Sequence, residues 1–130
     1  MQKLQFENSW DKTISQGDRE KIEKAFASTK LNQLHDIELV TLWHATNHKG
    51  DLLATAIIHN QTQQSISFEN SRIDCLDQNG VIAEHNFSLP NLHIPANTSL
   101  PWTFIFPAKS QTRKNVNPGE IIKLNIQLNQ

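Results

Sequence analysis

The spacing of two histidines gives the first test for chemistry in this chain. His44 and His48 are four positions apart, a spacing that on a helix would bring both imidazoles to one metal ion. The residues around them alternate between apolar and polar types, which predicts a strand, and four positions along a strand span about 13 Å. We therefore expect solvated strand or turn histidines and no metal site.

The sole cysteine, Cys75, could act as a nucleophile with a histidine. It lies beside Ile73 and Leu76 in the alternation of a predicted strand, where cysteine usually serves as a small buried apolar residue. We therefore interpret Cys75 as a core residue. A single cysteine also leaves no disulfide within the chain, which fits a reducing compartment.

Two pairs of carboxylates could serve as an acid and a base, Asp74 with Asp77 and Asp36 with Glu38. Each pair neighbours a turn or an exposed strand face, where carboxylates are usually solvated. The chain contains no Gly-x-Ser-x-Gly turn, no phosphate-binding glycine loop and no Cys-x-x-Cys motif. We expect a protein that is not an enzyme, with no catalytic residues and no cofactor.

The three tryptophans allow two interpretations. Trp43 and Trp102 could stack on a sugar ring, as solvent-facing aromatic side chains on sandwiches do, but their alternation with polar residues favours packing in a core. Trp10 lies outside any strong periodic pattern. It either fastens the N-terminal segment to the sheet or belongs to a contact surface.

Length and charge narrow the class of protein further. With 130 residues the chain has room for one domain, in which we assign residues 1–33 to an N-terminal segment and residues 34–130 to a sandwich. A net charge of −1 offers no strong field for nucleic acid or an anionic membrane. No run of apolar residues is long enough for membrane insertion or for a secretory signal. If Met1 is the natural start, the expected location is cytoplasmic.

One helix is predicted, at about residues 17–28. Ser15 can cap it and Asp18 stands three positions on, as a capping box requires. Ile22 and Phe26 belong to a narrow apolar stripe on an otherwise charged segment. Such a helix is expected to lie on the surface of a larger structure.

The pattern of the remaining chain predicts short strands separated by turns. Trp102, Phe104 and Phe106 alternate between Pro101 and Pro107, which predicts a strand that ends near both prolines and has one aromatic face. Further strands are expected near residues 36–46, 52–59, 66–76, 81–89 and 120–128, with turns at 47–50 and 77–80, a bulge near 69–71 and a loop at 90–98.

This pattern predicts a mainly β fold, an immunoglobulin-like antiparallel β-sandwich with one N-terminal helix. The apolar residues 52–59 fall in both phases of their strand, which indicates cover on both faces. The residues expected in the core are Trp43, Phe104, Phe106, Ile122, Leu124 and Ile126.

Four motifs follow one another along nearly the whole chain. They are Trp10 followed by Ile14-Ser-Gln-Gly-Asp-Arg-Glu-Lys-Ile-Glu-Lys-Ala-Phe26, then Ile57-Ile-His-Asn60, then Leu76-Asp-Gln-Asn-Gly-Val-Ile-Ala83 with Phe87, and last Ile94-Pro95 leading to Pro101-Trp-Thr-Phe-Ile-Phe-Pro107. Together they resemble the SLAP domain of the accessory Sec and S-layer assembly proteins, found in spore-forming and related Gram-positive bacteria.

The resemblance implies a non-enzymatic cytosolic factor that assists export or assembly of surface-layer proteins beside a dedicated secretion motor. Its partner would be another protein, a secreted client polypeptide or a second copy of the chain, which would make a homo-oligomer. The best-known members carry a duplicated domain, whereas this chain has one copy. The alternative hypothesis is a cell-envelope sandwich that binds glycan or wall polymer, which would need an export signal and a solvent-facing aromatic platform.

The loop at residues 108–119 is the candidate partner-contact site. About a dozen mostly polar residues exceed what is needed to join two strands, and loops of that length are often functional. Lys109, Arg113 and Lys114 would supply its charge. The alternative interpretation is a solvated connector, which would leave the edges of the sheets as the contact surface.

Overall fold

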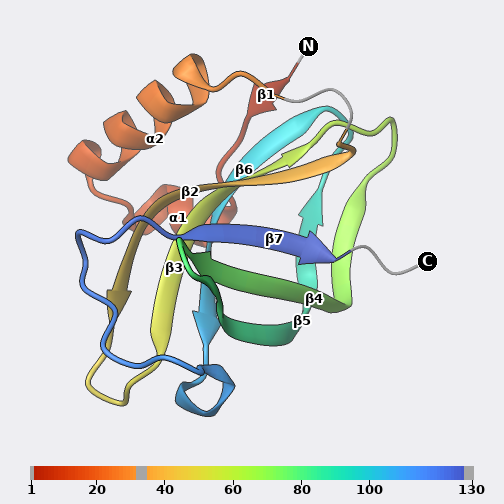
Figure 1. The fold of residues 1–130 in the computed structure, drawn as a ribbon. Helices are drawn as coiled ribbons and strands as arrows, with labels where there is room; N and C mark the ends of the chain where they lie inside the picture. The colour runs from red at the N-terminus through yellow and green to blue at the C-terminus, as the bar shows by residue number, and fades with distance from the viewer. Residues whose placement is uncertain (1, 32–34, 128–130) are drawn as a thin grey trace.

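The computed structural model describes residues 2–31 and 35–127. Within them the chain is mainly β, with two sheets and few helices (Figure 1). In chain order the elements are β1 (Lys3–Leu4), α1 (Asn8–Thr13), α2 (Gln16–Ser28), β2 (Ile37–Thr46), β3 (Leu52–Asn60), β4 (Ile66–Asp77), β5 (Gly80–Ile94), β6 (Thr98–Phe106), the 3-10 helix η1 (Ala108–Ser110) and β7 (Lys123–Gln127).

The strands form a four-stranded sheet with the order β1-β6-β3-β2 and a three-stranded sheet with the order β5-β4-β7. The short β1 pairs in parallel with β6, and every other pairing is antiparallel. The two sheets share one core, in which Phe68 and Phe87 of the smaller sheet meet Phe104 edge to face at 6.0 and 5.2 Å between ring centroids. The predicted mainly β architecture is confirmed.

The predicted helix is confirmed as α2. The Ser15 hydroxyl accepts a hydrogen bond from the Asp18 amide at 3.1 Å, which caps the helix at the expected residue. Ile22 is fully buried, and the Phe26 ring stacks on the His59 ring of β3 at 6.3 Å. The helix therefore covers part of the outer face of the larger sheet, the face turned away from the smaller sheet.

A second helix, α1, was not predicted. It has only six residues, too few for a periodic apolar pattern, and its start depends on Glu7. The Glu7 carboxylate accepts hydrogen bonds from the amides of Ser9 and Trp10, and Trp10 then stacks on Trp102 with 6.5 Å between ring centroids. The expectation of a single N-terminal helix is therefore wrong, because a local cap and one aromatic contact hold a second.

A β-bulge in β2 turns Trp43 away from the core. Thr41 lies opposite Ala56, but Trp43 lies opposite Thr55, so Leu42 is an extra residue without a partner on β3. Because side chains alternate between the faces of a sheet, one extra residue exchanges the faces of all that follow. The prediction of Trp43 in the core is wrong: its side chain is half-buried and lies outside the core cluster.

The other predicted core residues lie as expected. Phe104, Phe106, Ile122 and Leu124 are buried in the shared core, and Ile126 is partly buried against it. In β7 the alternation with exposed polar residues confirms a strand with one wet face. The predicted end of that strand at residue 128 lies outside the described residues.

Prolines interrupt the strands less than the sequence suggests. Pro107 follows the end of β6 as predicted, but Pro101 lies inside β6, so the prediction of an end there is wrong. β6 pairs with β1 only at Thr98 and Ser99. Beyond Ser99 it is an edge strand, where a residue without an N–H is tolerated.

The predicted loop at residues 90–98 is also wrong in part, because β5 continues through Pro90 to Ile94. The pairing of β4 with β5 is irregular on both sides of Phe68, and Pro90 lies in a stretch of β5 without a partner on β4. The predicted bulge near residues 69–71 is confirmed, with Asn70 at a φ of 50°. The two predicted turns, at residues 47–50 and 77–80, are confirmed as well.

Candidate functional site

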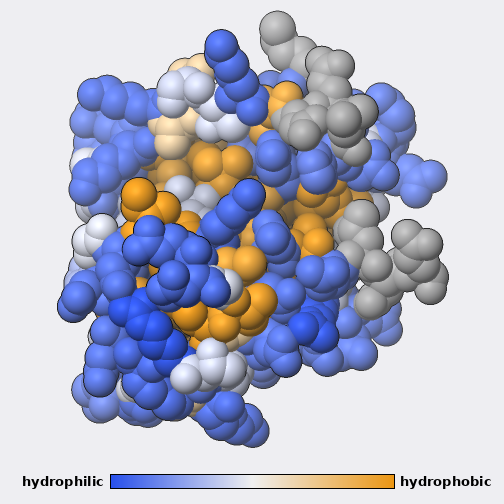
Figure 2. All heavy atoms as spheres, in the orientation of Figure 1, coloured by the Kyte–Doolittle hydropathy of each residue, from blue (hydrophilic) through white to orange (hydrophobic). Residues whose placement is uncertain are grey.

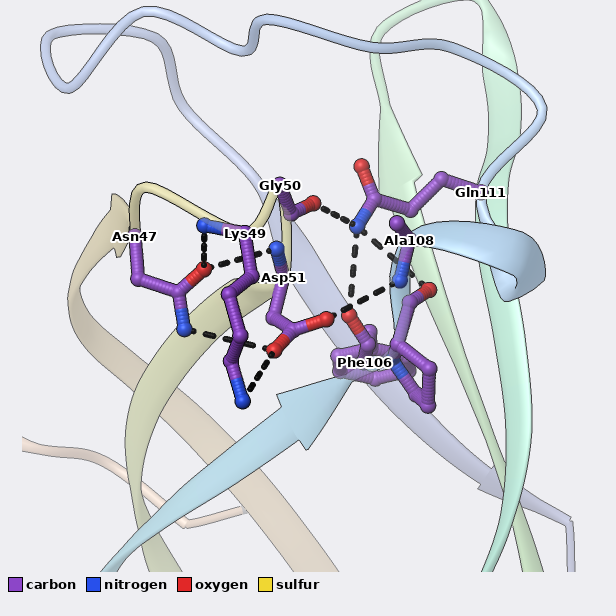
Figure 3. A network of polar contacts seen from close by, with 8 residues as sticks. Asn47, Lys49, Gly50, Asp51, Phe106, Ala108 and Gln111 are labelled. Atoms are coloured by element: carbon purple, nitrogen blue, oxygen red, sulfur yellow. Dashed lines mark hydrogen bonds and ion pairs between the residues drawn. The ribbon is translucent and has the colours of Figure 1, made fainter.

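The first part of the predicted contact loop is fastened to the turn between β2 and β3 (Figure 3). The Gln111 amide donates to the carbonyl oxygens of Gly50 at 2.8 Å and Phe106 at 3.1 Å. The Asp51 carboxylate accepts a hydrogen bond from the Ala108 amide at 3.2 Å. These contacts hold η1 against the sandwich.

The middle of the loop is fastened by Arg113. Its guanidinium lies 3.1 Å from the Asp77 carboxylate and 2.6 Å from the Glu120 carboxylate. The hydrogen bond from Arg113 holds the pKa of Glu120 below its ordinary value. Nearby, Val116 is buried in the shared core. Arg113 therefore joins the loop to the hairpin of β4 and β5.

The three basic residues predicted to act together are in different situations. Lys109 is exposed, Arg113 is engaged in two ion pairs, and the Lys114 ammonium donates to the Ala108 carbonyl oxygen of its own loop. The geometry is that of a well-anchored connector between the two sheets. The loop remains a candidate contact surface only through exposed side chains such as Lys109.

The edges β2 and β7 lie beside each other and form an open side of the sandwich (Figure 1). Within the described residues β2 pairs only with β3 and β7 only with β4, so each strand keeps one side outside any ladder. A groove runs between them, lined by side chains of both strands. Its apolar members are Ile37, Leu39, Leu124 and Ile126. Figure 2 shows hydrophobic residues gathered on this face of the molecule.

The opposite side, where β5 and β6 meet, is less suited to added strands. Pro101 and Pro90 remove backbone donors from β6 and β5, and β1 covers the start of β6. The connector adds to this, because the Thr112 amide donates to the Ile82 carbonyl oxygen at 2.8 Å and Gln111 bridges to Ala83. Among the described residues, the β2 and β7 side thus presents strand edges that contain no proline and have no covering strand.

The histidines do not form a metal site. His44 faces the sandwich interior, is 7% exposed, and places Nε2 2.7 Å from the Glu120 carbonyl oxygen, while His48 lies exposed in the turn. The prediction of a solvated histidine is wrong for His44, because the β2 bulge turns it inwards. Among residues 2–31 and 35–127 no group of three His, Cys, Asp or Glu side chains is placed to hold a metal ion.

His59 is a buried histidine whose situation the sequence did not reveal. It is fully buried beneath α2, and its Nδ1 lies 2.6 Å from the Ser99 hydroxyl oxygen. Its Nε2 has no hydrogen-bond partner in the described part of the chain. Burial lowers the pKa of His59 to about 4. The only sequence signal was its place in a strand that is apolar in both phases.

Cys75 and the carboxylates of Asp74 and Asp77 make structural contacts. Cys75 is fully buried, as predicted, and burial with the nearby charge of Asp77 raises the pKa of its thiol to about 12. Asp74 is only 7% exposed and pairs with Arg72 at 3.0 Å, so the expectation of a solvated carboxylate is wrong there. Asp74 and Asp77 each bind a different arginine.

Trp10 and Trp43 lie at the outer face of the larger sheet, whereas Trp102 lies on its core side. Trp102 packs against the shared core, and its ring stacks with that of Trp10. Trp43 lines a hollow together with Trp10 and residues of β3 and β6. The core interpretation is therefore confirmed for Trp102 and wrong for Trp43, and Trp10 fastens the N-terminal segment to the sheet.

Two packed sheets with antiparallel pairing and one open pair of edges define a mainly β protein with a surface suited to strand addition. A family model described as the SLAP domain matches residues 4–128, nearly the whole chain. The chain belongs to the SLAP domain family. A search of curated proteins found no match, and a search of solved structures found none either. In the described part of the chain, no helix has the length and apolar character to cross a membrane.

Proposed function

We propose that this chain is a non-enzymatic protein-interaction domain that works in the cytoplasm as an accessory factor in protein secretion or surface-layer assembly. Membership of the SLAP domain family supports the secretion role, since the family model is named for accessory Sec. The buried free thiol of Cys75 is compatible with a reducing compartment. A Gram-positive bacterium is the expected setting.

The open side formed by β2 and β7 is the observation that carries the proposal. An extended polypeptide can add to an exposed sheet edge, where main-chain hydrogen bonds give affinity and pockets for alternate side chains give selectivity. The groove between β2 and β7 offers both: two strand edges, and apolar contacts from Leu39 and Leu124 at its floor. A client polypeptide in extended form, before it folds, has the chemistry to bind there.

The test is site-specific photo-crosslinking in cells. A photoreactive residue at Asn125, exposed on β7, is expected to crosslink to the precursor of an exported protein or to a component of the secretion motor. The matched control places the same residue at Glu23, exposed on α2. Equal crosslinking at both positions, or crosslinks at Asn125 to no exported or secretory protein, would reject the proposal.

The loop at residues 108–119 is the rival surface for the same partner. Replacing the two exposed lysines of the loop, Lys109 and Lys114, with Ser removes charge from its surface, keeps the Arg113 ion pairs with Asp77 and Glu120, and changes no residue of β2 or β7. If the open side binds the client, crosslinking from Asn125 keeps its partner and its yield. Loss of the crosslinked partner from Asn125 would indicate that the loop is the binding surface.

We also propose that the two sheets form a variant of the immunoglobulin-like sandwich. In the part of the chain that the structure describes, seven strands form one sheet of four and one of three, with antiparallel pairing in all but β1, which supports this proposal. The parallel pairing of β1 with β6 tests the strand order most directly, and spin labels at Lys3 and Thr98 would measure it. A separation inconsistent with neighbouring strands would reject this arrangement.

A further inference from the structure

A hollow of about 540 Å³ lies between α1, the start of α2 and the outer face of the larger sheet. Tryptophans Trp10 and Trp43 belong to its walls, and Thr55 and Thr103 belong to the sheet beneath. Its volume falls within the usual range for small-ligand sites, roughly 300–1,000 Å³. None of its lining residues belongs to the groove between β2 and β7.

The aromatic wall exists because of the bulge in β2. If Leu42 were paired in regular alternation, Trp43 would point into the core, whereas the bulge leaves its indole half-buried beside the hollow. The Lys21 ammonium lies 6.0 Å from the centre of the Trp43 ring, at the outer limit of a cation–π contact. Lys21 is exposed, so its side chain can move aside and release the ring.

The hollow also contains polar groups with unused hydrogen-bonding capacity. The hydroxyl oxygens of Thr55 and Thr103 lie 2.7 Å apart, so one of their two protons joins them and the other stays free to donate. Thr55 is only 3% exposed. The Asp18 carboxylate makes no hydrogen bond or ion pair with any described residue, and Ser15 accepts a bond while its own proton is unused.

These groups select the chemistry of a ligand. The lining includes one carboxylate and no basic side chain, which disfavours phosphate and other anions. A purely apolar ligand would bury the Asp18 carboxylate and the threonine hydroxyls without partners. A sugar ring meets both requirements, because its C–H face can stack on an indole while its hydroxyls donate to a carboxylate and exchange hydrogen bonds with hydroxyls.

We propose that this hollow binds a neutral sugar ring, with Trp43 as the stacking platform, Asp18 as the hydroxyl acceptor, and Thr55 with Thr103 as the polar floor. The site is independent of the strand edges proposed for the polypeptide. A single ring in an open hollow is expected to bind in the millimolar range.

The experiment titrates the full chain with glucose, N-acetylglucosamine and chitobiose, using calorimetry and the amide and indole N–H signals in NMR spectra. At least one of these sugars is expected to bind with a millimolar Kd and to shift the Trp43 indole signal. Trp43→Ala is expected to weaken binding at least about tenfold and Asp18→Asn several-fold. Val81→Ala, an exposed position on β5, is the matched control and should leave the Kd unchanged.

Trp43→Phe and Thr103→Val keep the test decisive if Trp43→Ala fails to fold. Thr103→Val retains the shape of the side chain and removes the hydroxyl, so a several-fold loss of affinity in a variant with wild-type melting temperature supports the site. Absence of binding by all three sugars up to about 50 mM overturns the proposal. Sugar binding that Trp43→Phe and Thr103→Val both leave unchanged also overturns it. A shift of the Trp43 indole signal by a lysine-rich peptide, with no shift by any of the three sugars, overturns it as well.

Discussion

Strands β3 and β7 are both rich in apolar residues, but they are buried in different ways. In β3 nearly every residue is buried, on the core face and on the outer face alike. In β7 buried or partly buried residues alternate with exposed ones. The difference comes from α2, which covers the outer face at β3 through contacts such as Phe26 on His59. Apolar residues on both faces of a strand therefore indicate that another element packs on the face turned away from the core.

Removing the N-terminal segment that covers β3 is the strongest test of this difference between β3 and β7. Deletion of residues 1–29 takes away β1, α1 and α2, and exposes Ile57 and His59, which are fully buried in the complete chain. We expect the shortened chain to bind a hydrophobic dye and to aggregate, measured by fluorescence and size-exclusion chromatography. A monomer with the melting temperature of the full chain and no dye binding would show that the helices are a separate arm.

Neighbouring residues of β3 should be equally sensitive to truncation. Ile57 lies on the outer face and Ile58 on the core face, and both are fully buried. Ile57→Ala and Ile58→Ala should each lower the free energy of unfolding by about 2–5 kcal/mol in chemical denaturation. A cost below about 1 kcal/mol for Ile57→Ala alone would mean that α2 covers the sheet only loosely.

Neighbouring residues of β7 should differ. Leu124 is 2% exposed in the core, whereas Lys123 is exposed. Leu124→Ala should lower the free energy of unfolding by about 2–5 kcal/mol and Lys123→Ala by less than about 0.5 kcal/mol. Urea denaturation of both variants provides the measurement, and equal costs would contradict the one-sided burial of β7.

Acid should lower the stability of the protein through His59, which lies beneath α2. The pKa of His59 is lowered from 6.5 to about 4 by burial, so between these pH values the unfolded chain binds a proton that the folded chain excludes. Stability from this group is complete above about pH 6.5 and falls by roughly 3 kcal/mol as the pH approaches 4.

Denaturation curves of wild type and His59→Gln at pH 7, 5.5 and 4.5 measure this effect. The variant should lose the share of the pH dependence that His59 contributes, and His48→Gln, in an exposed turn, should keep it. Identical pH dependence in wild type and His59→Gln would contradict the burial of His59 beneath α2.

Local signals in the sequence predicted the elements that depend on neighbours in the chain. The Ser15 cap predicted the start of α2, and the turn at residues 77–80 predicted the hairpin of β4 and β5. The alternation around Leu124 predicted which face of β7 is buried. Features that depend on distant partners were missed. Pro101 is tolerated because β1 ends its pairing early, and β5 passes Pro90 because Leu92 and Ile94 gain burial.

The features of the candidate site that depend on distant partners were likewise not predictable from the sequence. The anchored state of Arg113 depends on Asp77 and Glu120, and no spacing in the sequence shows that the three meet. The open side depends on how two sheets bring β2 and β7 together at one edge. The strand edges were named as an alternative surface from the sandwich class alone, but the class could not say which pair was left uncovered.

The unpaired Leu42 has a consequence for comparing members of the family. A relative that lacks one residue between Thr41 and Trp43 would pair regularly with β3 and still turn the tryptophan outwards and the histidine inwards, because the tryptophan would still lie opposite Thr55. A relative of the same length that pairs without the bulge would instead turn residue 43 into the core and residue 44 to solvent. Such relatives should carry a core residue in place of Trp43 and a polar residue in place of His44, so these two positions mark, from sequence, which relatives keep the hollow.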